Sequence, residues 1–258
     1  MSLEIHQFAC LSDNYGYLLH DPASEETVCI DTPDAETYMR EAARKGWQIT
    51  QIWNTHWHPD HAGGNAAIKA ATHCTVVAPQ DDAEKIAGID RTVTHGDVVR
   101  LGEWEAHVID VGGHTMGHIA YHVPGAEVAF VGDSLFALGC GRMFEGTAPQ
   151  FWQSLTRLKA LPPETMICCA HEYTAANAKF ALHADPENAA LQAYAADIAR
   201  LRELNRPTVP AKLGRELETN PFLRADDPGL QARWAEHGAI VGDPVATFAA
   251  LRAAKDNF

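Results

Sequence analysis

Basic residues and long apolar runs are scarce in this sequence of 258 residues. It holds 20 Lys and Arg against 34 Asp and Glu, which gives a formal net charge of −14 at pH 7. Nucleic acids and anionic membranes are bound through clustered Lys and Arg, so this balance disfavours both as partners. No apolar run approaches the ~18 residues that a membrane-spanning helix needs. A local basic patch can still bind a small anion.

Closely spaced cysteine pairs and a signal peptide are also missing. The chain has no C-x-x-C pair and no disulfide framework of the kind found in small secreted domains. Several cysteines lie inside apolar runs, as Cys29 does between Val28 and Ile30, where a thiol behaves as a small apolar side chain. The N-terminus lacks the basic and then apolar pattern of a secretion signal. Thiols in a core indicate a reducing compartment, and we expect a cytoplasmic protein.

What the sequence does contain is enough apolar material for a globular core. The apolar fraction is 46%, which is ordinary for a globular protein, and the length suits one large domain or one medium domain with an appendage. Apolar runs bounded by turn residues predict strands, and Ala-rich segments predict helices. The predicted strands are 3–8, 15–20, 27–30, 49–54, 74–78, 104–111, 119–123, 128–131 and 165–170, and the predicted helices are 34–45, 65–72 and 150–161.

The composition changes after Tyr173. Residues 174–204 are rich in Ala, Leu, Glu and Arg and contain no convincing strand, and residues 228–254 contain two more helical stretches. We therefore predict a mixed α and β domain over 1–173 and a helical domain over 174–258. For the helix at 34–45 we expect Thr32 as the N-cap and Gly46 as the stop.

The densest cluster of chemically active side chains follows the strand predicted at 49–54. His56, His58, Asp60 and His61 fall within six residues. In an extended segment the two histidines point to one side and can grip a single ion. Pro59 turns the chain, which places Asp60 and His61 to reach a second ion. Nitrogen and oxygen ligands suit zinc, iron or manganese better than calcium or a soft thiolate metal.

Three later residues complete a set of seven candidate ligands. His114 follows a Gly pair, and Asp133 and His171 each follow an apolar strand. Alone, each histidine would more often be a core or surface residue, and Asp133 a helix cap. Together they suggest one ion held by His56, His58 and His114 and another by Asp60, His61 and His171. The two oxygens of Asp133 could bridge the ions.

This pattern resembles the metallo-β-lactamase superfamily, and within it the glyoxalase II (hydroxyacylglutathione hydrolase) family. The superfamily resemblance rests on the ligand set. The closer one extends along the whole chain through segments that include 11–15, 139–147, 171–174, 220–224 and 252–258. The resemblance implies an α+β fold, a metallo-β-lactamase-like αββα sandwich, with a C-terminal helical domain, and a binuclear site with zinc as the first choice of metal.

The resemblance also implies which residues contact the substrate. Arg142, Tyr173, Arg252 and Lys255 correspond to positions that bind the glutathione part. Phe144 stands where some members carry Tyr, so ring packing rather than a hydroxyl contact is expected there. Without the family, Arg142 would be an ordinary loop cation and Tyr173 a strand-end aromatic, and Arg252 and Lys255 would belong to a solvated helix end. Arg252 and Lys255 are three apart on one predicted helix face and could hold a carboxylate.

The implied reaction is hydrolysis of S-D-lactoylglutathione to D-lactate and glutathione, a step of methylglyoxal detoxification. Two divalent metal ions can lower the pKa of water from about 15.7 toward ~7 and stabilise an oxyanion. Asp60 and Asp133 can orient the attacking hydroxide besides binding metal. The thiolate leaves without a general acid, because a free thiol has a pKa of only ~8.5. Asp31, at a strand end, could support a ligand histidine or serve the turn before the helix.

Two other functions compete with the thioester hydrolase. Persulfide dioxygenases resemble the same superfamily and carry a similar loop with one iron, but they look shorter at the C-terminus. A non-catalytic metal-binding module would bind metal without turning over any thioester. The expected partner is thus a small-molecule glutathione thioester, with no nucleic acid and no membrane, and we expect a monomer.

Overall fold

The structure, a computed structural model, describes residues 2–258 and divides into two compact units. The first unit holds the chain up to Asp110 together with Thr115–Gly132. The second holds Val111–His114 and Asp133–Phe258. These units are groups of mutually contacting residues, and the boundary at residue 173 between two functional domains stays a prediction.

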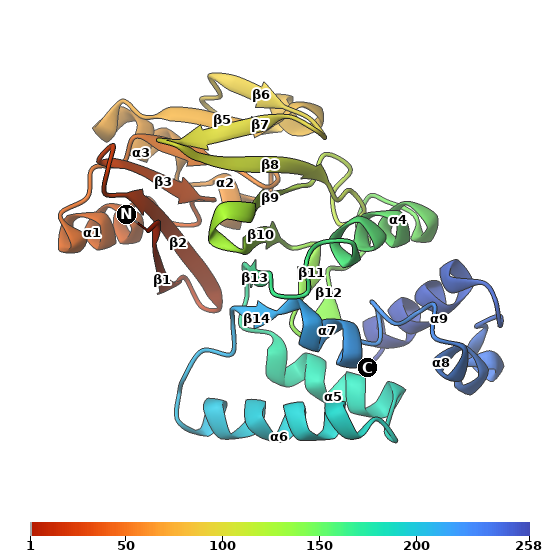
Figure 1. The fold of residues 1–258 in the computed structure, drawn as a ribbon. Helices are drawn as coiled ribbons and strands as arrows, with labels where there is room; N and C mark the ends of the chain where they lie inside the picture. Colours follow the sequence, from red (N-terminus) through yellow and green to blue (C-terminus); the bar gives the residue numbers. More distant parts are fainter. Residues whose placement is uncertain (1) are drawn as a thin grey trace. The chain divides into compact units, whose positions relative to one another are not determined.

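One sheet of the first unit combines two strand directions (Figure 1, red to yellow). Its first three strands pair antiparallel, and β3, β4, β5 and β6 continue the sheet in parallel. Parallel neighbours need crossover connections, and helices supply two of them. The strands are β1 (Glu4–Cys10), β2 (Asn14–Asp21), β3 (Glu26–Ile30), β4 (Gln51–Trp53), β5 (Thr75–Pro79) and β6 (Arg91–Val93).

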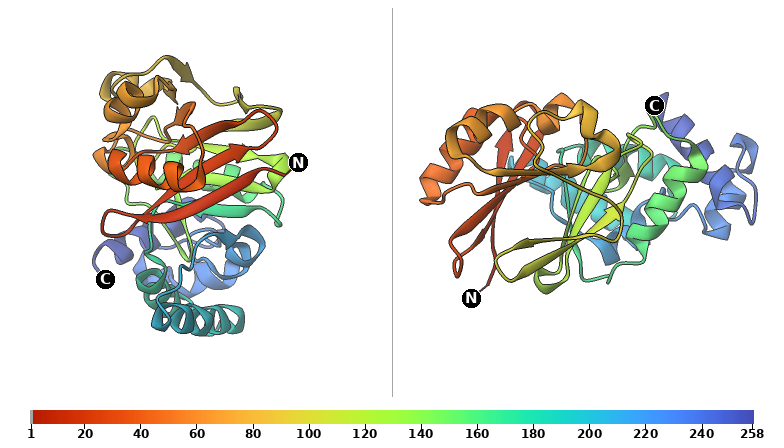
Figure 2. Two further views of the ribbon diagram at one scale, coloured as in Figure 1. Left: turned by 90° about the vertical axis from the view of Figure 1, so that its left-hand side faces the viewer. Right: turned by 90° about the horizontal axis from the view of Figure 1, so that it is seen from above.

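Helices cover one face of this sheet. Figure 2 (right) shows them along one side of the red strands, with the yellow-green strands along the other side. The core beneath α1 includes its Tyr38 and Ala42, Leu18 of β2 and Ile52 of β4. The helical segments of this unit are α1 (Ala35–Lys45), α2 (Pro59–Ala62), α3 (Asn65–Thr72), η1 (Gln80–Lys85) and η2 (Pro124–Ala126).

A second antiparallel sheet lies against the other face. In this unit it comprises β7 (Val98–Leu101), β8 (Trp104–Asp110), β9 (Ile119–Val123) and β10 (Val128–Gly132), with each strand pairing with the next. The sheets meet through aromatic rings: the ring centroids of Tyr17 and Phe130 are 5.4 Å apart, and those of Trp53 and Tyr121 are also 5.4 Å apart. Because neighbouring residues of a strand face opposite sides, Tyr17 points between the sheets while Leu18 packs under the helices.

The second unit is mainly helical. Its elements are β11 (Leu135–Phe136), β12 (Gly139–Cys140), α4 (Ala148–Lys159), β13 (Met166–Cys169), α5 (Thr174–Ala184), α6 (Ala189–Glu203), β14 (Ala211–Lys212), α7 (Leu213–Thr219), α8 (Pro228–Arg233), η3 (Ala235–His237) and α9 (Pro244–Asp256). Its core includes three fully buried rings: Phe180 of α5, Phe248 of α9, and Phe222 between α7 and α8. None of the helices among residues 2–258 is long and apolar enough to cross a membrane.

Most predicted elements lie within two residues of the observed ones, and one predicted cap is wrong. The N-cap of α1 is Asp34, whose carboxylate accepts from the backbone N–H of Thr37 at 2.8 Å. Thr32 is buried instead, and its hydroxyl donates to Asn65 Oδ1 at 2.5 Å. Gly46 does end the helix, with a left-handed φ of 73° that glycine adopts freely.

Candidate metal centre and substrate pocket

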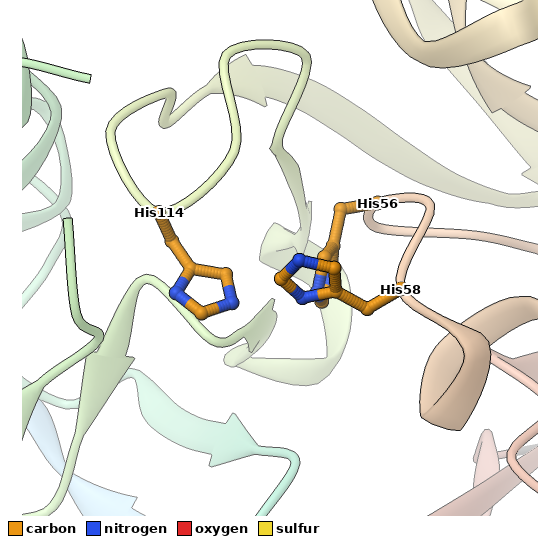
Figure 3. A group of neighbouring side chains, drawn as sticks. All are labelled: His56, His58 and His114. Atoms are coloured by element: carbon orange, nitrogen blue, oxygen red, sulfur yellow. The ribbon is translucent and has the colours of Figure 1, made fainter. Parts of the chain in front are cut away.

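The metal motif lies on the loop after β4 and continues into α2. The Nε2 atom of His56 lies 3.0 Å from Nδ1 of His58, so the two imidazoles share one side of the loop as their spacing predicts. Figure 3 shows His56 and His58 on this loop, and it also draws His114, which follows β8. Pro59 is the first residue of α2, so Asp60 and His61 sit on the short helix after the turn.

Asp31 fixes the orientation of His61. Its carboxylate accepts from the Thr55 backbone N–H at 2.7 Å and from the Thr55 hydroxyl at 2.8 Å, and it lies 2.8 Å from Nδ1 of His61. An ionised carboxylate can only accept, so Nδ1 of His61 carries the proton and Nε2 keeps its lone pair. That Nε2 lies 3.6 Å from Oδ2 of Asp60. The Asp31 side chain thus bonds to a candidate ligand histidine and to the loop before it, which favours the first of the two roles that the sequence left open.

Asn14 and Asn54 hold the short helix in place. Asn14 donates to the backbone oxygen of Asp60 at 3.2 Å and to its Oδ2 at 3.3 Å. The buried Asn54 amide donates to the backbone oxygen of His61 at 3.1 Å. Ligand atoms of Asp31, His56 and His61 lie within 4.8 Å of one another. This unit therefore gathers several nitrogen and oxygen donors in a mostly buried place.

His118 was not predicted to belong to this cluster. Its ring is fully buried and stacks on His56, with centroids 4.4 Å apart and an interplanar angle of 18°. A Cβ on Gly132 would lie 2.5 Å from the Thr55 hydroxyl and 2.8 Å from His118, and its φ is 48°. Only glycine fits there. The spacing of four between His114 and His118 was the one sequence signal, and a spacing alone does not separate a ligand from a packing residue.

The second unit brings the other three candidate ligands together. Nδ1 of His114 lies 2.9 Å from the backbone oxygen of Arg142, and its Nε2 lies 3.4 Å from Oδ2 of Asp133. Nε2 of His171 lies 3.3 Å from Oδ1 of Asp133. A backbone carbonyl only accepts, so Nδ1 of His114 is the donor and Nε2 is left for an ion. All three side chains are buried.

A cavity of about 380 Å³ opens beside His114 and Asp133. All five residues predicted to contact the substrate line it: Arg142, Phe144, Tyr173, Arg252 and Lys255. The residues that the sequence did not single out are Phe136, Cys140, Gly141, Ala176 and Asn177. Small and apolar residues in a loop or helix carry no signal of a pocket until the fold brings them together.

Three cations line the cavity: Arg142, Arg252 and Lys255. Arg252 is 3% exposed, and it donates to the Cys140 backbone oxygen at 2.9 Å and to Asp256 at 2.9 Å. Burial lowers the pKa of Lys255, and the charges of Arg252 and Arg142 lower it further. Asp256 pairs with Arg252 and offsets part of this positive charge, and the charge that remains favours an anionic ligand.

Aromatic rings lie beside two of the candidate ligands, His171 and His114. Tyr173 stacks on His171 with centroids 4.7 Å apart and an angle of 1° between the planes. The Phe144 ring is 62% exposed and lies 5.2 Å from that of His114. An exposed ring beside a cavity can pack on a ligand, and the contact expected of Phe144 stays a prediction.

The donor set fits a divalent metal. Imidazole nitrogens and carboxylate oxygens are preferred by zinc, iron and manganese, and two of the histidines are held in the tautomer that leaves Nε2 for an ion. Burial raises the pKa of Cys140, beside the pocket, to about 11, which disfavours its thiolate as a ligand.

Comparisons with known families identify the relatives of this chain. The family model of the metallo-β-lactamase superfamily matches residues 15–171, and that of the hydroxyacylglutathione hydrolase C-terminus matches residues 172–258. The hydroxyacylglutathione hydrolase of Erythrobacter litoralis is 67% identical over 99% of this chain and 100% of its own length. That of Hyphomonas neptunium is 58% identical over 99% of this chain and 98% of its own.

A solved structure gives the same fold at a greater distance. The crystal structure of ETHE1 from Myxococcus xanthus is 26% identical, has a TM-score of 0.67, and matches 99% of this chain and 98% of its own. The match to the two hydrolases is far closer and covers the full length. The chain therefore belongs to the hydroxyacylglutathione hydrolase family of enzymes, in the metallo-β-lactamase superfamily, and has that superfamily's α+β fold with a helical C-terminal region.

Proposed function

We propose that this chain hydrolyses S-D-lactoylglutathione and related 2-hydroxyacyl glutathione thioesters to the hydroxy acid and glutathione. Family membership over the full length supports this proposal. The single observation that carries it is the cavity, which is lined both by the candidate ligands His114 and Asp133 and by the cations Arg142, Arg252 and Lys255. The cations suit an anionic thiol carrier, whose acyl group would then lie beside the candidate ligands.

We assign two divalent ions to the seven candidate ligands. His56, His58 and His114 would hold one ion, and Asp60, His61 and His171 the other, with Asp133 shared. The fixed tautomers of His61 and His114 support this assignment. Zinc is our first choice, with iron or manganese as alternatives. When bound, such ions lower the pKa of water and polarise a carbonyl.

The protein's own groups would position the reactants. Ionised Asp60 and Asp133 are acceptors only, so their oxygens can orient an attacking water and take up its proton. Asp31 keeps His61 in one tautomer. The leaving thiolate needs no protein acid, since a free thiol has a pKa of only ~8.5. Arg142, Arg252 and Lys255 would bind the glutathione part, and Tyr173 and Phe144 would pack on it.

Three further assignments complete the proposal. A catalytic domain over 1–173 and a substrate-binding helical domain over 174–258 would divide the work. The six cysteines are all buried free thiols, which supports a cytoplasmic location in the reducing compartment expected above. We propose that the enzyme acts as a monomer, because the residues assigned to metal and substrate all come from one chain.

The test is the hydrolysis rate of purified, metal-analysed protein on S-D-lactoylglutathione. An Arg142→Ala/Lys255→Ala variant should raise KM about tenfold or more with kcat little changed, since each lost charge-assisted contact is worth about 1.5–3 kcal/mol when buried and less when exposed. Arg233→Ala/Lys159→Ala removes two cations elsewhere in the same unit and should leave KM unchanged.

Two results would contradict the proposed function. No turnover with about two ions bound per chain, the occupancy of a two-metal site, would refute the thioester assignment. Oxygen uptake with glutathione persulfide by an iron-loaded protein would support the dioxygenase instead.

A further inference from the structure

A short hairpin carries much of the wall of the substrate cavity. Its strands β11 and β12 pair Leu135 with Cys140 and Phe136 with Gly139. Phe136, Cys140 and the two following residues line the cavity. The guanidinium of Arg252 donates to the backbone oxygen of Cys140 at 2.9 Å. The position of this hairpin therefore sets where two of the cavity's cations, Arg142 and Arg252, can lie.

The hairpin does not hold its shape by pairing alone. Two-stranded hairpins are marginally stable by themselves. Leu138 in the turn has a φ of 56°, a left-handed conformation that residues with a Cβ adopt at a cost. Something outside the hairpin must compensate for this.

Two fully buried polar side chains from α7 and the residue after it supply the missing contacts. Glu216 accepts from the Leu138 backbone N–H at 2.7 Å. Asn220 donates to the backbone oxygens of Phe136 at 3.1 Å and Gly139 at 3.0 Å, and to Glu216 at 3.0 Å. One carboxylate and one amide thus fasten both strands and the turn. Figure 1 shows α7 below this hairpin in the same unit.

We propose that Glu216 and Asn220 are positioning residues for substrate binding, which hold the 135–140 hairpin so that Arg142 and Arg252 face the thiol carrier. This inference rests on the proposed function. Neither side chain lines the cavity, so both act through the hairpin and contact no reacting atom.

Glu216 also gives this contact a pH dependence. Burial raises its pKa to about 7, while the bonds from Leu138 and Asn220 and the charge of Arg215 act in the opposite direction. Tyr194 of α6 faces the same carboxyl group, and Cys169 of β13 interacts with it electrostatically. The ionised form is the better acceptor for the Leu138 N–H. Ionisation of Glu216 therefore strengthens its bond to Leu138 although it lowers the free energy of unfolding, and we expect KM to rise as the pH falls below about 7.

The experiment compares kinetics of Asn220→Ala with those of the unchanged metal-loaded enzyme. KM for S-D-lactoylglutathione, and the Kd of the product glutathione measured by calorimetry, should both rise about tenfold, while kcat changes less than about threefold, as loss of one buried hydrogen-bond set predicts. Gln231→Ala is the matched control, because it removes another buried amide that bonds Ala225 and Gly242 in the same unit. Its thermal stability should fall while KM stays unchanged.

Two further variants keep the inference refutable. Should Asn220→Ala not fold, Asn220→Ser replaces it, since a hydroxyl can donate to only one of the two carbonyls. Combining Asn220→Ala with Arg142→Ala should give a smaller KM increase than the sum of the two effects, which a purely structural role would not produce. Glu216→Gln keeps an acceptor for Leu138 and should flatten the rise of KM at acid pH.

The outcomes separate this inference from the proposed function. If the protein without substitutions hydrolyses no thioester, the proposed function is refuted, and this inference falls with it. An active enzyme whose folded Asn220 variant keeps its KM and its glutathione Kd, or shows fully additive effects with Arg142→Ala, would overturn the inference alone.

Discussion

The support that Asp31 gives to the metal loop makes a quantitative prediction. In Asp31→Asn, one amide oxygen can still accept from the Thr55 backbone N–H, but the amide nitrogen then faces the Thr55 hydroxyl and His61 Nδ1. An amide N–H donates, so His61 is driven to the other tautomer, with its proton on Nε2. That proton occupies the lone pair that the proposed second ion needs.

The expected cost follows from what such supporting carboxylates contribute elsewhere. Loss of a carboxylate behind a ligand histidine weakens metal binding about 10- to 100-fold, or about 1.4–2.7 kcal/mol. We expect this loss for one ion of two, with the other retained. Titration of the apoprotein with zinc against a competing chelator measures the two affinities separately, and hydrolysis at each occupancy follows the activity.

A buried carboxylate elsewhere provides the control. Asp21 is 3% exposed and accepts three bonds from Ala23 and Ser24 in a turn. Asp21→Asn should lower stability without changing either metal affinity. Two unchanged zinc affinities in Asp31→Asn would refute the tautomer argument.

Three further predictions concern stability and activity. Gly132→Ala should destabilise the protein by more than about 2 kcal/mol and lower kcat, because the new Cβ would overlap Thr55 and His118. Gly46→Ala is the control: a Cβ there has no atom within 4 Å, so chemical denaturation should show a loss of only about 1 kcal/mol. Asp34→Ala removes the cap of α1 and should lower the free energy of unfolding by about 1 kcal/mol. Hydrogen bonds from Thr37 lower the pKa of Asp34, so the stability difference between variant and parent should vanish in acid, once the pH falls below the folded-state pKa. Burial raises the pKa of Glu216 to about 7, so its contribution is fully present below the unfolded pKa of ~4.3 and falls by a few kcal/mol as pH rises to 7; a Glu216→Gln protein whose stability declines as steeply over that window would contradict this.

The regular elements were predictable where apolar periodicity was strong. The strand at 119–123 and the helix at 65–72 have the predicted bounds. The missed strands β6, β7, β11, β12 and β14 have two to four residues each, too few to show a period. The cap of α1 was misassigned because Thr32 and Asp34 are both good caps by type. Only the tertiary contact of Thr32 with Asn65 decides between them.

The candidate ligands could be proposed from the sequence because metal chemistry permits few residue types and the main loop supplies four of them within six positions. The supporting residues are of another kind. Asp31 acts on a loop 24 positions away, and Glu216 acts on a turn 78 positions away. An aspartate or glutamate at such a place has no distinguishing neighbours in the chain, since its partner is a backbone N–H that any residue would offer. A motif search therefore finds the atoms that bind the ion and overlooks those that fix their tautomer and position. In this protein the second group is where mutations far from the motif should alter binding, and the Asp31 and Asn220 variants test that expectation, one in each unit.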